Sequence, residues 1–224
     1  MEHAPETLAR TPALDHDHPA VAAFVGRWAG EGPPRERARR LYYAVRDGIR
    51  YDPYAFHVTP DRLAASRTLE ARAGWCVPKA VLLAACCRGA GIPARLGFAD
   101  VRNHLATERL LQLTGTDLFV WHGYVAMLLE GQWVKATPAF NIEMCRRFGV
   151  LPLEFDGTAD SLLQPYDARG QRHMEYVRDR GLFDDLPGAE IEAAMRATYP
   201  RLVAAAEAAG PPGSFDTDPI RRPR

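Results

Sequence analysis

One stretch constrains this chain more than any other: Gly74-Trp75-Cys76-Val77-Pro78, which is followed by the apolar run 81–87. Proline is tolerated in the first turn of a helix and not further in, so Cys76 is expected within a residue of a helix start. The helix that follows, 78–88, is apolar nearly all round, which predicts that it is buried. The other elements of the fold must therefore surround this helix.

The position of Cys76 has two interpretations. Unpaired backbone N–H groups and the positive end of the helix dipole favour a thiolate there, and Lys79 adds a cation one turn away. The same N–H groups suit the oxyanion that forms when a sulfur attacks a carbonyl. Alternatively, Cys76 is a small packing residue, because free cysteine is among the most buried residue types.

Composition excludes several classes of protein. The 224 residues are 47% hydrophobic and 25% charged, and 28 basic side chains balance 28 acidic ones, so we expect no nucleic-acid or membrane partner. No apolar run approaches a membrane span and residues 1–18 do not resemble a signal sequence, so we expect a cytoplasmic protein. The four cysteines lack the paired spacing of zinc sites, so we expect no disulfide, metal or cofactor.

The chain divides into a flexible arm, 1–18, one domain, 19–204, and a loosely ordered tail, 205–224. Apolar periodicity predicts helices that begin at Pro19 and Pro34. Beyond the central helix we expect strands and helices in turn: strands 92–99, 119–129 and 132–137, a short helix 105–113, and helices 171–180 and 190–199. Residues 100–117, between two strands, form either a lid or a surface excursion.

His122 is the candidate general base. If Glu130-Gly131 forms a two-residue hairpin turn, His122 lies opposite Ala139, with Thr137 and Asn141 as diagonal neighbours on its face. A histidine flanked in this way suits the activation of a thiol. A core histidine bonded to a backbone carbonyl is the alternative, and a slip of one residue would turn the whole set to the other face.

Together these features resemble the transglutaminase-like superfamily, a circularly rearranged relative of papain-type cysteine peptidases. The resemblance covers about residues 35–142 and rests on four motifs: Gly74-Trp75-Cys76, Gly91-Ile92-Pro93-Ala94-Arg95, Trp121-His122-Gly123-Tyr124-Val125, and Gln132-Trp133-Val134-Lys135-Ala136-Thr137-Pro138. It implies an α+β, papain-like fold in which the helix carrying Cys76 packs on an antiparallel sheet carrying His122. It also implies a Cys-His-acid triad that forms a thioester and releases it to water or to an amine.

One residue departs from that family pattern. The family has an aspartate where this chain has Thr137, and a threonine supplies no negative charge to an imidazolium. Thr137 accepts a hydrogen bond only weakly, so we expect Asn141 to orient the ring, as in a Cys-His-Asn site, ahead of Thr137 and then Asp156.

Four further residues are candidates for binding substrate: Trp75, Asn103, His104 and Tyr124. Each also has an ordinary structural explanation, as a core or packing residue for Trp75 and Tyr124 and as loop residues for Asn103 and His104. The resulting hypothesis is a cysteine-dependent peptidase or amidase acting on a peptide or protein amide. Acyl transfer to an amine and a binding module without turnover are the alternatives, and Thr137 favours the second. Nothing in the sequence indicates an oligomeric state.

Overall fold

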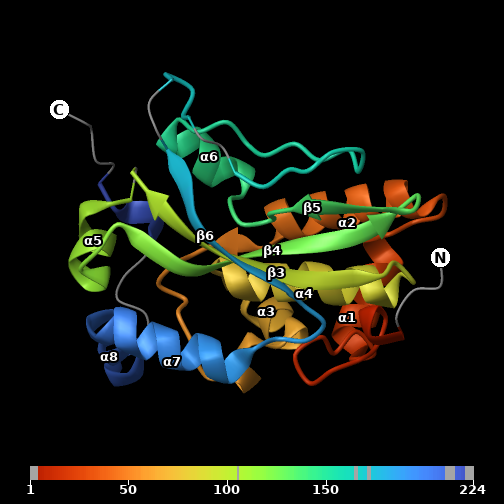
Figure 1. Ribbon diagram of the computed structural model, residues 1–224, viewed down its shortest axis with the longest axis horizontal. Coiled ribbons are helices and arrows are strands. Elements are labelled where there is room, and N and C mark those ends of the chain that lie inside the picture. The colour runs from red at the N-terminus through yellow and green to blue at the C-terminus, as the bar shows by residue number, and fades with distance from the viewer. Residues whose placement is uncertain (1–4, 105, 164–165, 171–172, 210–214, 220–224) are drawn as a thin grey trace.

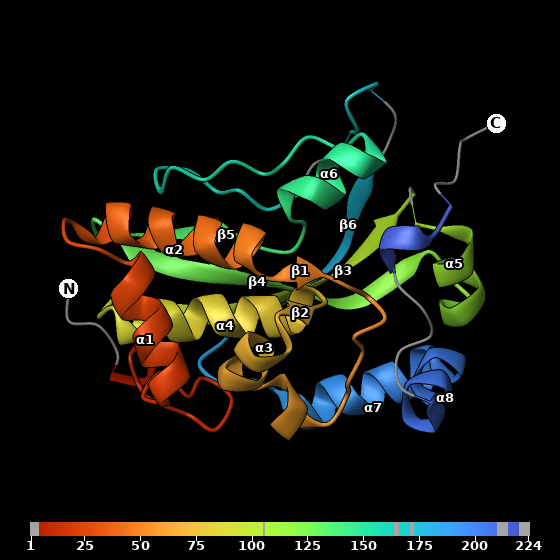
Figure 2. The same ribbon diagram turned by 180° about the vertical axis from the view of Figure 1, so that it is seen from behind.

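The computed structural model describes residues 5–104, 106–163, 166–170, 173–209 and 215–219 (Figure 1). Its main sheet is antiparallel, with the strands in the order β5, β4, β3, β6: Gln132–Ala136, Leu118–Leu129, Ala94–Asn103 and Met174–Phe183. Helices on one side of this sheet are α1 (Pro19–Trp28), α2 (Pro34–Gly48), α3 (Ala65–Ala71) and α4 (Cys76–Gly89) (Figure 2). The fold is therefore α+β, as predicted.

Helix α4 is the centre of the fold. It begins at Cys76 with Trp75 as its N-cap residue, and every residue from Cys76 to Arg88 is buried. One side of the helix packs on β3 and β4, and the other sides pack on α1, α2 and α3. The buried ammonium of Lys79 donates hydrogen bonds to the carbonyl oxygens of Arg46 and Ile49 at the end of α2. Lys79 therefore stabilises the C-terminal end of α2 and does not supply the cation that we expected beside Cys76.

The β4–β5 hairpin has the predicted register near its turn. Both turn residues, Glu130 and Gly131, have positive φ angles of 50° and 84°, as a tight hairpin turn requires. The ladder runs from the pair Leu129 and Gln132 to the pair Val125 and Ala136, where β5 ends. The expected pairing of His122 with residue 139 is therefore not part of the ladder.

One predicted element is wrong. Residues 174–180, expected within a helix, belong to strand β6, which pairs with β3 along its length; Gln171 and Arg172 lie outside the described residues. Tyr176 and Val177 are good strand formers. The open edge of β3 also supplies hydrogen-bond partners that the sequence of the segment alone does not reveal.

Short elements complete the fold. Strand β1 (Arg50–Tyr51) pairs in parallel with β2 (Ala73–Gly74), which places Tyr51 beside the chain entering α4. The predicted helices 105–113 and 190–199 correspond to α5 and α7. The remaining elements are α5 (Glu108–Thr114), α6 (Ile142–Phe148), α7 (Gly188–Thr198), α8 (Pro200–Ala209), η1 (Pro5–Thr7), η2 (Pro60–Leu63) and η3 (Phe215–Thr217).

Described residues near both chain ends pack on the rest of the fold. Leu14 is fully buried, and the Ala65 N–H donates to the Ala13 carbonyl at 3.0 Å. Near the other end, buried Phe215 stacks on Phe148, and buried Asp218 accepts a hydrogen bond from the hydroxyl of Thr107 at 3.0 Å. Within the described part of the chain, no helix combines the length and apolar character needed to span a membrane.

Candidate active site

Cys76 and His122 line the same cavity of about 50 Å³, together with Trp75 and Asn103. The walls come from segments far apart in the sequence: Tyr51, Pro53, Phe56, Leu110, Thr114, Phe119, Val120, Phe140, Met174, Met195, Tyr199 and Leu202. A cavity of this size holds only a few water molecules. Cys76 and His122, which we paired from the sequence, therefore share one small, largely apolar cavity.

Gly123 brings β4 against the first turn of α4. A Cβ atom at Gly123 would lie 3.2 Å from the Val77 Cα and 3.3 Å from the Cys76 carbonyl oxygen, which is tighter than ordinary packing. The backbone N–H of Gly123 also lies near the Cys76 sulfur, where it favours the thiolate and so lowers the pKa. His122, the preceding residue, is thereby held beside the start of α4.

Burial keeps both reacting groups uncharged. It raises the pKa of the Cys76 thiol to about 11, because desolvation outweighs the nearby N–H groups of Gly123, Val77 and Cys76 itself. Burial, with a smaller contribution from His173, lowers the pKa of His122 to about 4. The expectation that the helix start would make this thiol acidic is therefore wrong, and at neutral pH the pair is a thiol and a neutral imidazole.

Among the buried side-chain polar atoms without a hydrogen-bond partner in the described residues are Nε2 of His122 and Oγ1 of Thr137. The backbone of Thr137 is well fixed, since its N–H donates to the Ser161 carbonyl at 2.9 Å and its carbonyl accepts from the Tyr42 hydroxyl at 3.2 Å. A neutral imidazole N–H needs an acceptor, and a hydroxyl oxygen is one. Thr137 therefore offers a free acceptor on the segment that follows β5.

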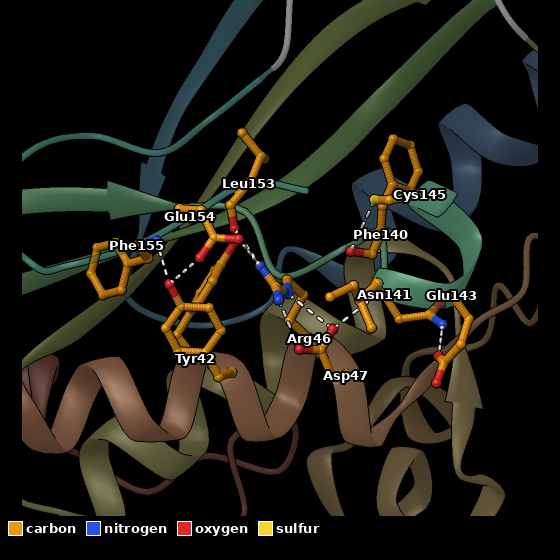
Figure 3. Close-up of polar contacts among 12 residues, drawn as sticks. Tyr42, Arg46, Asp47, Phe140, Asn141, Glu143, Cys145, Leu153, Glu154 and Phe155 are labelled. Carbon is orange, nitrogen blue, oxygen red and sulfur yellow. Dashed lines mark hydrogen bonds and ion pairs between the residues drawn. The ribbon is translucent and has the colours of Figure 1, made fainter. Parts of the chain in front are cut away.

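The amide of Asn141 has other partners. Its Oδ1 accepts a hydrogen bond from the Tyr51 N–H at 3.0 Å. Its Nδ2 donates to the Glu143 carboxylate at 2.7 Å (Figure 3). These contacts tie β1 to the start of α6. Asp156, the third candidate, accepts hydrogen bonds from the N–H and hydroxyl of Thr158, both at 2.8 Å, in an exposed turn.

Two of the proposed substrate-binding residues do not line this cavity. The ring of Tyr124 lies over Gly97, so closely that a Cβ atom there would be 2.1 Å from it. His104 lines a separate groove, where its Nε2 lies 3.5 Å from the Glu175 carboxylate. Tyr124 and His104 are therefore outside the space that holds Cys76 and His122.

The wall of the cavity that α7 and α8 form was not predicted from the sequence. Met195, Tyr199 and Leu202 come from α7, α8 and their junction, beyond the segment that carries the motifs. The Tyr199 hydroxyl accepts a hydrogen bond from the Val120 N–H at 2.6 Å and donates to the Leu118 carbonyl at 2.9 Å. The helical periodicity of this segment predicts α7, but nothing in it indicates which strand the helix covers.

In the described residues, no three His, Cys, Asp or Glu side chains are grouped to hold a metal ion.

Comparisons with known proteins indicate the family of the chain. No curated protein matches the sequence. A solved structure of a candidate cysteine protease from Cytophaga hutchinsonii is 17% identical and has a TM-score of 0.47, covering 97% of this chain. This chain spans 58% of the length of that protein.

The family model of the transglutaminase-like superfamily core matches residues 22–138, just over half of the chain. The matched range includes α4 with Cys76, β4 with His122, and Thr137. The chain belongs to the transglutaminase-like superfamily.

Proposed function

We propose that this protein is a cysteine-dependent amide hydrolase that works through a thioester. The observation that carries the proposal is the shared cavity of Cys76, at the first position of α4, and His122, on β4. The Cys76 sulfur attacks the carbonyl carbon of a peptide or protein amide, and His122 takes the thiol proton. His122 then gives that proton to the departing amine, and a water molecule, with His122 again as base, releases the acid.

The uncharged resting pair decides how the first step proceeds. Because the thiol pKa lies at about 11 and the imidazole pKa at about 4, no thiolate–imidazolium pair exists before attack. Proton transfer must therefore accompany attack, and the N–H groups of Gly123 and Val77 stabilise the negative charge that develops on the sulfur as its proton leaves. The small cavity also means that its walls must part before an amide and its flanking residues can enter.

Thr137 is the residue that we propose as acceptor for the far nitrogen of His122, ahead of Asn141. Both Thr137 Oγ1 and His122 Nε2 are buried without partners in the described structure, whereas Asn141 is bonded to Tyr51 and Glu143. A hydroxyl stabilises an imidazolium less than a carboxylate does. We therefore expect a slower reaction than a Cys-His-Asp site would give.

Two alternatives have specific support. Acyl transfer to an amine is favoured by the apolar walls, because Leu110, Met195 and Leu202 exclude the competing water. A binding module without turnover is favoured by Thr137 and by the raised thiol pKa. A fluorescent primary amine, added after acylation, separates hydrolysis from transfer by whether the acyl group appears on the amine.

Alkylation by iodoacetamide at pH 7.5, mapped over all four thiols, tests the proposal. We expect Cys76 to react at least about tenfold faster than Cys86, Cys87 and Cys145, all buried, with this advantage lost in His122→Ala. His16→Ala is the control, because His16 lies against Gly89, at the opposite end of α4 from Cys76, and does not line the cavity. Slow, uniform labelling of the four thiols supports the binding module instead.

Replacement of the sulfur separates chemistry from packing. Cys76→Ala is expected to abolish turnover and to change the free energy of unfolding by less than about 1 kcal/mol, since the cavity beside it already interrupts the packing. Leu83→Ala in the same helix, at a fully buried position, is the control and is expected to cost about 2–5 kcal/mol. If Cys76→Ala lowers the free energy of unfolding by a similar amount and turnover persists without the sulfur, Cys76 is a structural residue.

A further inference from the structure

Strand β4 contains an irregularity directly before His122. In the pairing of β3 with β4, Ala99 lies opposite His122 and Val101 lies opposite Phe119. Asp100, between them, therefore lies opposite two residues, Val120 and Trp121, whereas a regular ladder would place one residue there. This is a β-bulge, a feature that turns side chains of a strand to new directions. Since a shift of one residue reverses the face to which each side chain points, the bulge decides where His122 points relative to the start of β4.

The backbone at the bulge is strained. Trp121 has a φ angle of 57°, in the left-handed region that large side chains rarely occupy. Such a conformation costs free energy and persists only where the surroundings impose it, and it is frequent at functional sites. Trp121 is buried, so the surroundings here are protein groups rather than solvent.

Asp100 and Arg180 impose that conformation. The Asp100 carboxylate accepts a hydrogen bond from the Trp121 N–H at 3.0 Å, which is the group that the bulge leaves without a ladder partner. Arg180, on β6, donates two hydrogen bonds to the same carboxylate at 2.6 and 2.9 Å. Its guanidinium also lies 4.6 Å from the centre of the Trp121 ring. The Asp100 Oδ1 atom thus accepts hydrogen bonds from the strained peptide and from the Arg180 guanidinium at once.

The second N–H of the bulge is satisfied separately. Val120 donates to the Tyr199 hydroxyl, so Asp100 does not serve it. With the Tyr199 contact in place, the loss of the Asp100 carboxylate leaves the buried Trp121 N–H without an acceptor. We expect the strand to relieve both the unpaired N–H and the left-handed φ by rotating at Trp121, and to move His122, the next residue, with it.

We infer that Asp100 is a positioning residue that acts through the Trp121 backbone to direct His122 toward Cys76. The inference rests on the proposed function, since it assigns Asp100 a role in the activation of Cys76 by His122. Asp100 itself does not line the cavity, so it touches neither the sulfur nor a substrate held there. We therefore expect its effect on Cys76 to pass through His122, which the double-mutant cycle below tests.

A double-mutant cycle tests this route. The iodoacetamide rate of Cys76 is measured at pH 7.5 in the full chain, in Asp100→Ala, in His122→Ala and in the double variant. Asp100→Ala is expected to slow the reaction about tenfold when His122 is present and less than about twofold when it is absent. General loosening of the fold would change the rate by the same factor in both backgrounds, and that result overturns the inference.

Two further variants separate positioning from stability. Asp100→Asn keeps an oxygen that accepts the Trp121 N–H, so its rate is expected to stay within about threefold of the unsubstituted protein. Val101→Ala truncates a buried neighbour on the same strand and is expected to lower the melting temperature without slowing Cys76. An Asn variant as slow as Asp100→Ala, despite an unchanged circular dichroism spectrum, contradicts a role for the N–H acceptor.

The outcomes also distinguish this inference from the proposed function. If the unsubstituted protein labels Cys76 no faster than His122→Ala does, the proposed function fails and this inference fails with it. If His122→Ala slows labelling and Asp100→Ala does not, the proposed function stands and the role of Asp100 alone is overturned.

Discussion

Around Arg46, between α2 and α6, buried polar groups pair with one another, whereas around His122 they do not. The Arg46 guanidinium donates to both oxygens of Asp47 at 3.0 and 2.8 Å and to the Leu153 carbonyl at 2.7 Å (Figure 3). Asp47 in turn accepts from the Ile142 N–H at the start of α6, at 3.0 Å. The His122 Nε2 and Thr137 Oγ1 atoms, by contrast, have no partner among the described residues.

The difference separates a structural use of polar groups from a chemical one. A saturated buried network holds elements together, and removal of one member leaves the others uncompensated. An unsaturated buried group costs stability, so its presence in a native structure calls for a functional explanation. The α2–α6 network thus fixes the segment that follows β5, whereas His122 Nε2 and Thr137 Oγ1 stay without partners in the described structure.

Removal of Arg46 is expected to have the largest effect on stability. Arg46→Ala leaves the Asp47 carboxylate and the Leu153 carbonyl without their donor and should lower the free energy of unfolding by about 3–5 kcal/mol. Arg35→Ala on the same helix is the control, because its pair with Glu130 is exposed and should contribute less than about 1 kcal/mol. Urea denaturation measures both, and equal losses would remove the distinction between the two regions.

Acid should destabilise the cavity region next most strongly. The pKa of His122 is lowered to about 4 in the fold, against 6.5 for the free group, so the unfolded chain binds the proton at the higher pH. Stability therefore falls as the pH drops from about 6.5 to about 4, by about 3 kcal/mol for this group. Denaturation of His122→Gln at pH 7.5 and 4.5 checks this, and a pH dependence identical to that of the unsubstituted protein would contradict it.

Addition of a methyl group at Gly123 should lower the free energy of unfolding by less than the two changes above. Gly123→Ala forces β4 away from the backbone of Val77 and Cys76 and should cost about 1–3 kcal/mol. It should also slow alkylation of Cys76, because His122 moves with the strand. Gly26→Ala in α1, where a Cβ atom meets nothing within 4 Å, is the control for an added methyl group and should leave the rate unchanged.

Thr137 and Asn141 should give the smallest changes and rank the two candidate acceptors. Thr137→Val keeps the shape and removes a hydroxyl without a partner, so stability should change by less than about 1 kcal/mol. Alkylation of Cys76 should nevertheless slow several-fold. Asn141→Ala should destabilise by about 1–2 kcal/mol, through loss of the Tyr51 and Glu143 contacts, with little change in rate. The reverse ranking of rates would return the orienting role to Asn141.

Local sequence signals predicted the parts of the fold that depend on neighbouring residues. Pro78 and the apolar run after it place α4, and the Glu130-Gly131 turn fixes the β4–β5 register. Strand β6 was missed because its pairing with β3 spans about 80 residues of sequence. The bulge at Trp121 was missed for the same reason, since its acceptor, Asp100, lies on another strand.

The candidate site shows the same limit. Cys76 and His122 were identified because a helix start and a polar residue in an apolar strand are both visible in the sequence. The sign of the thiol pKa shift was not predicted, because it depends on burial, and the cavity beside Cys76 is lined by residues from segments far apart in the sequence, α7 and α8 included. The partners of Asn141 were missed because Tyr51 lies on a strand 90 residues earlier.

Formation of an acyl-enzyme tests the central claim most directly. The full-length protein is incubated with p-nitrophenyl acetate at pH 7.5, and the modified residue is identified by intact mass and peptide mapping. We expect one acetyl group on Cys76, formed about a hundredfold more slowly in His122→Ala and at an unchanged rate in His16→Ala. Acetylation spread over other residues, or modification of Cys76 that does not depend on His122, would contradict a shared reaction site.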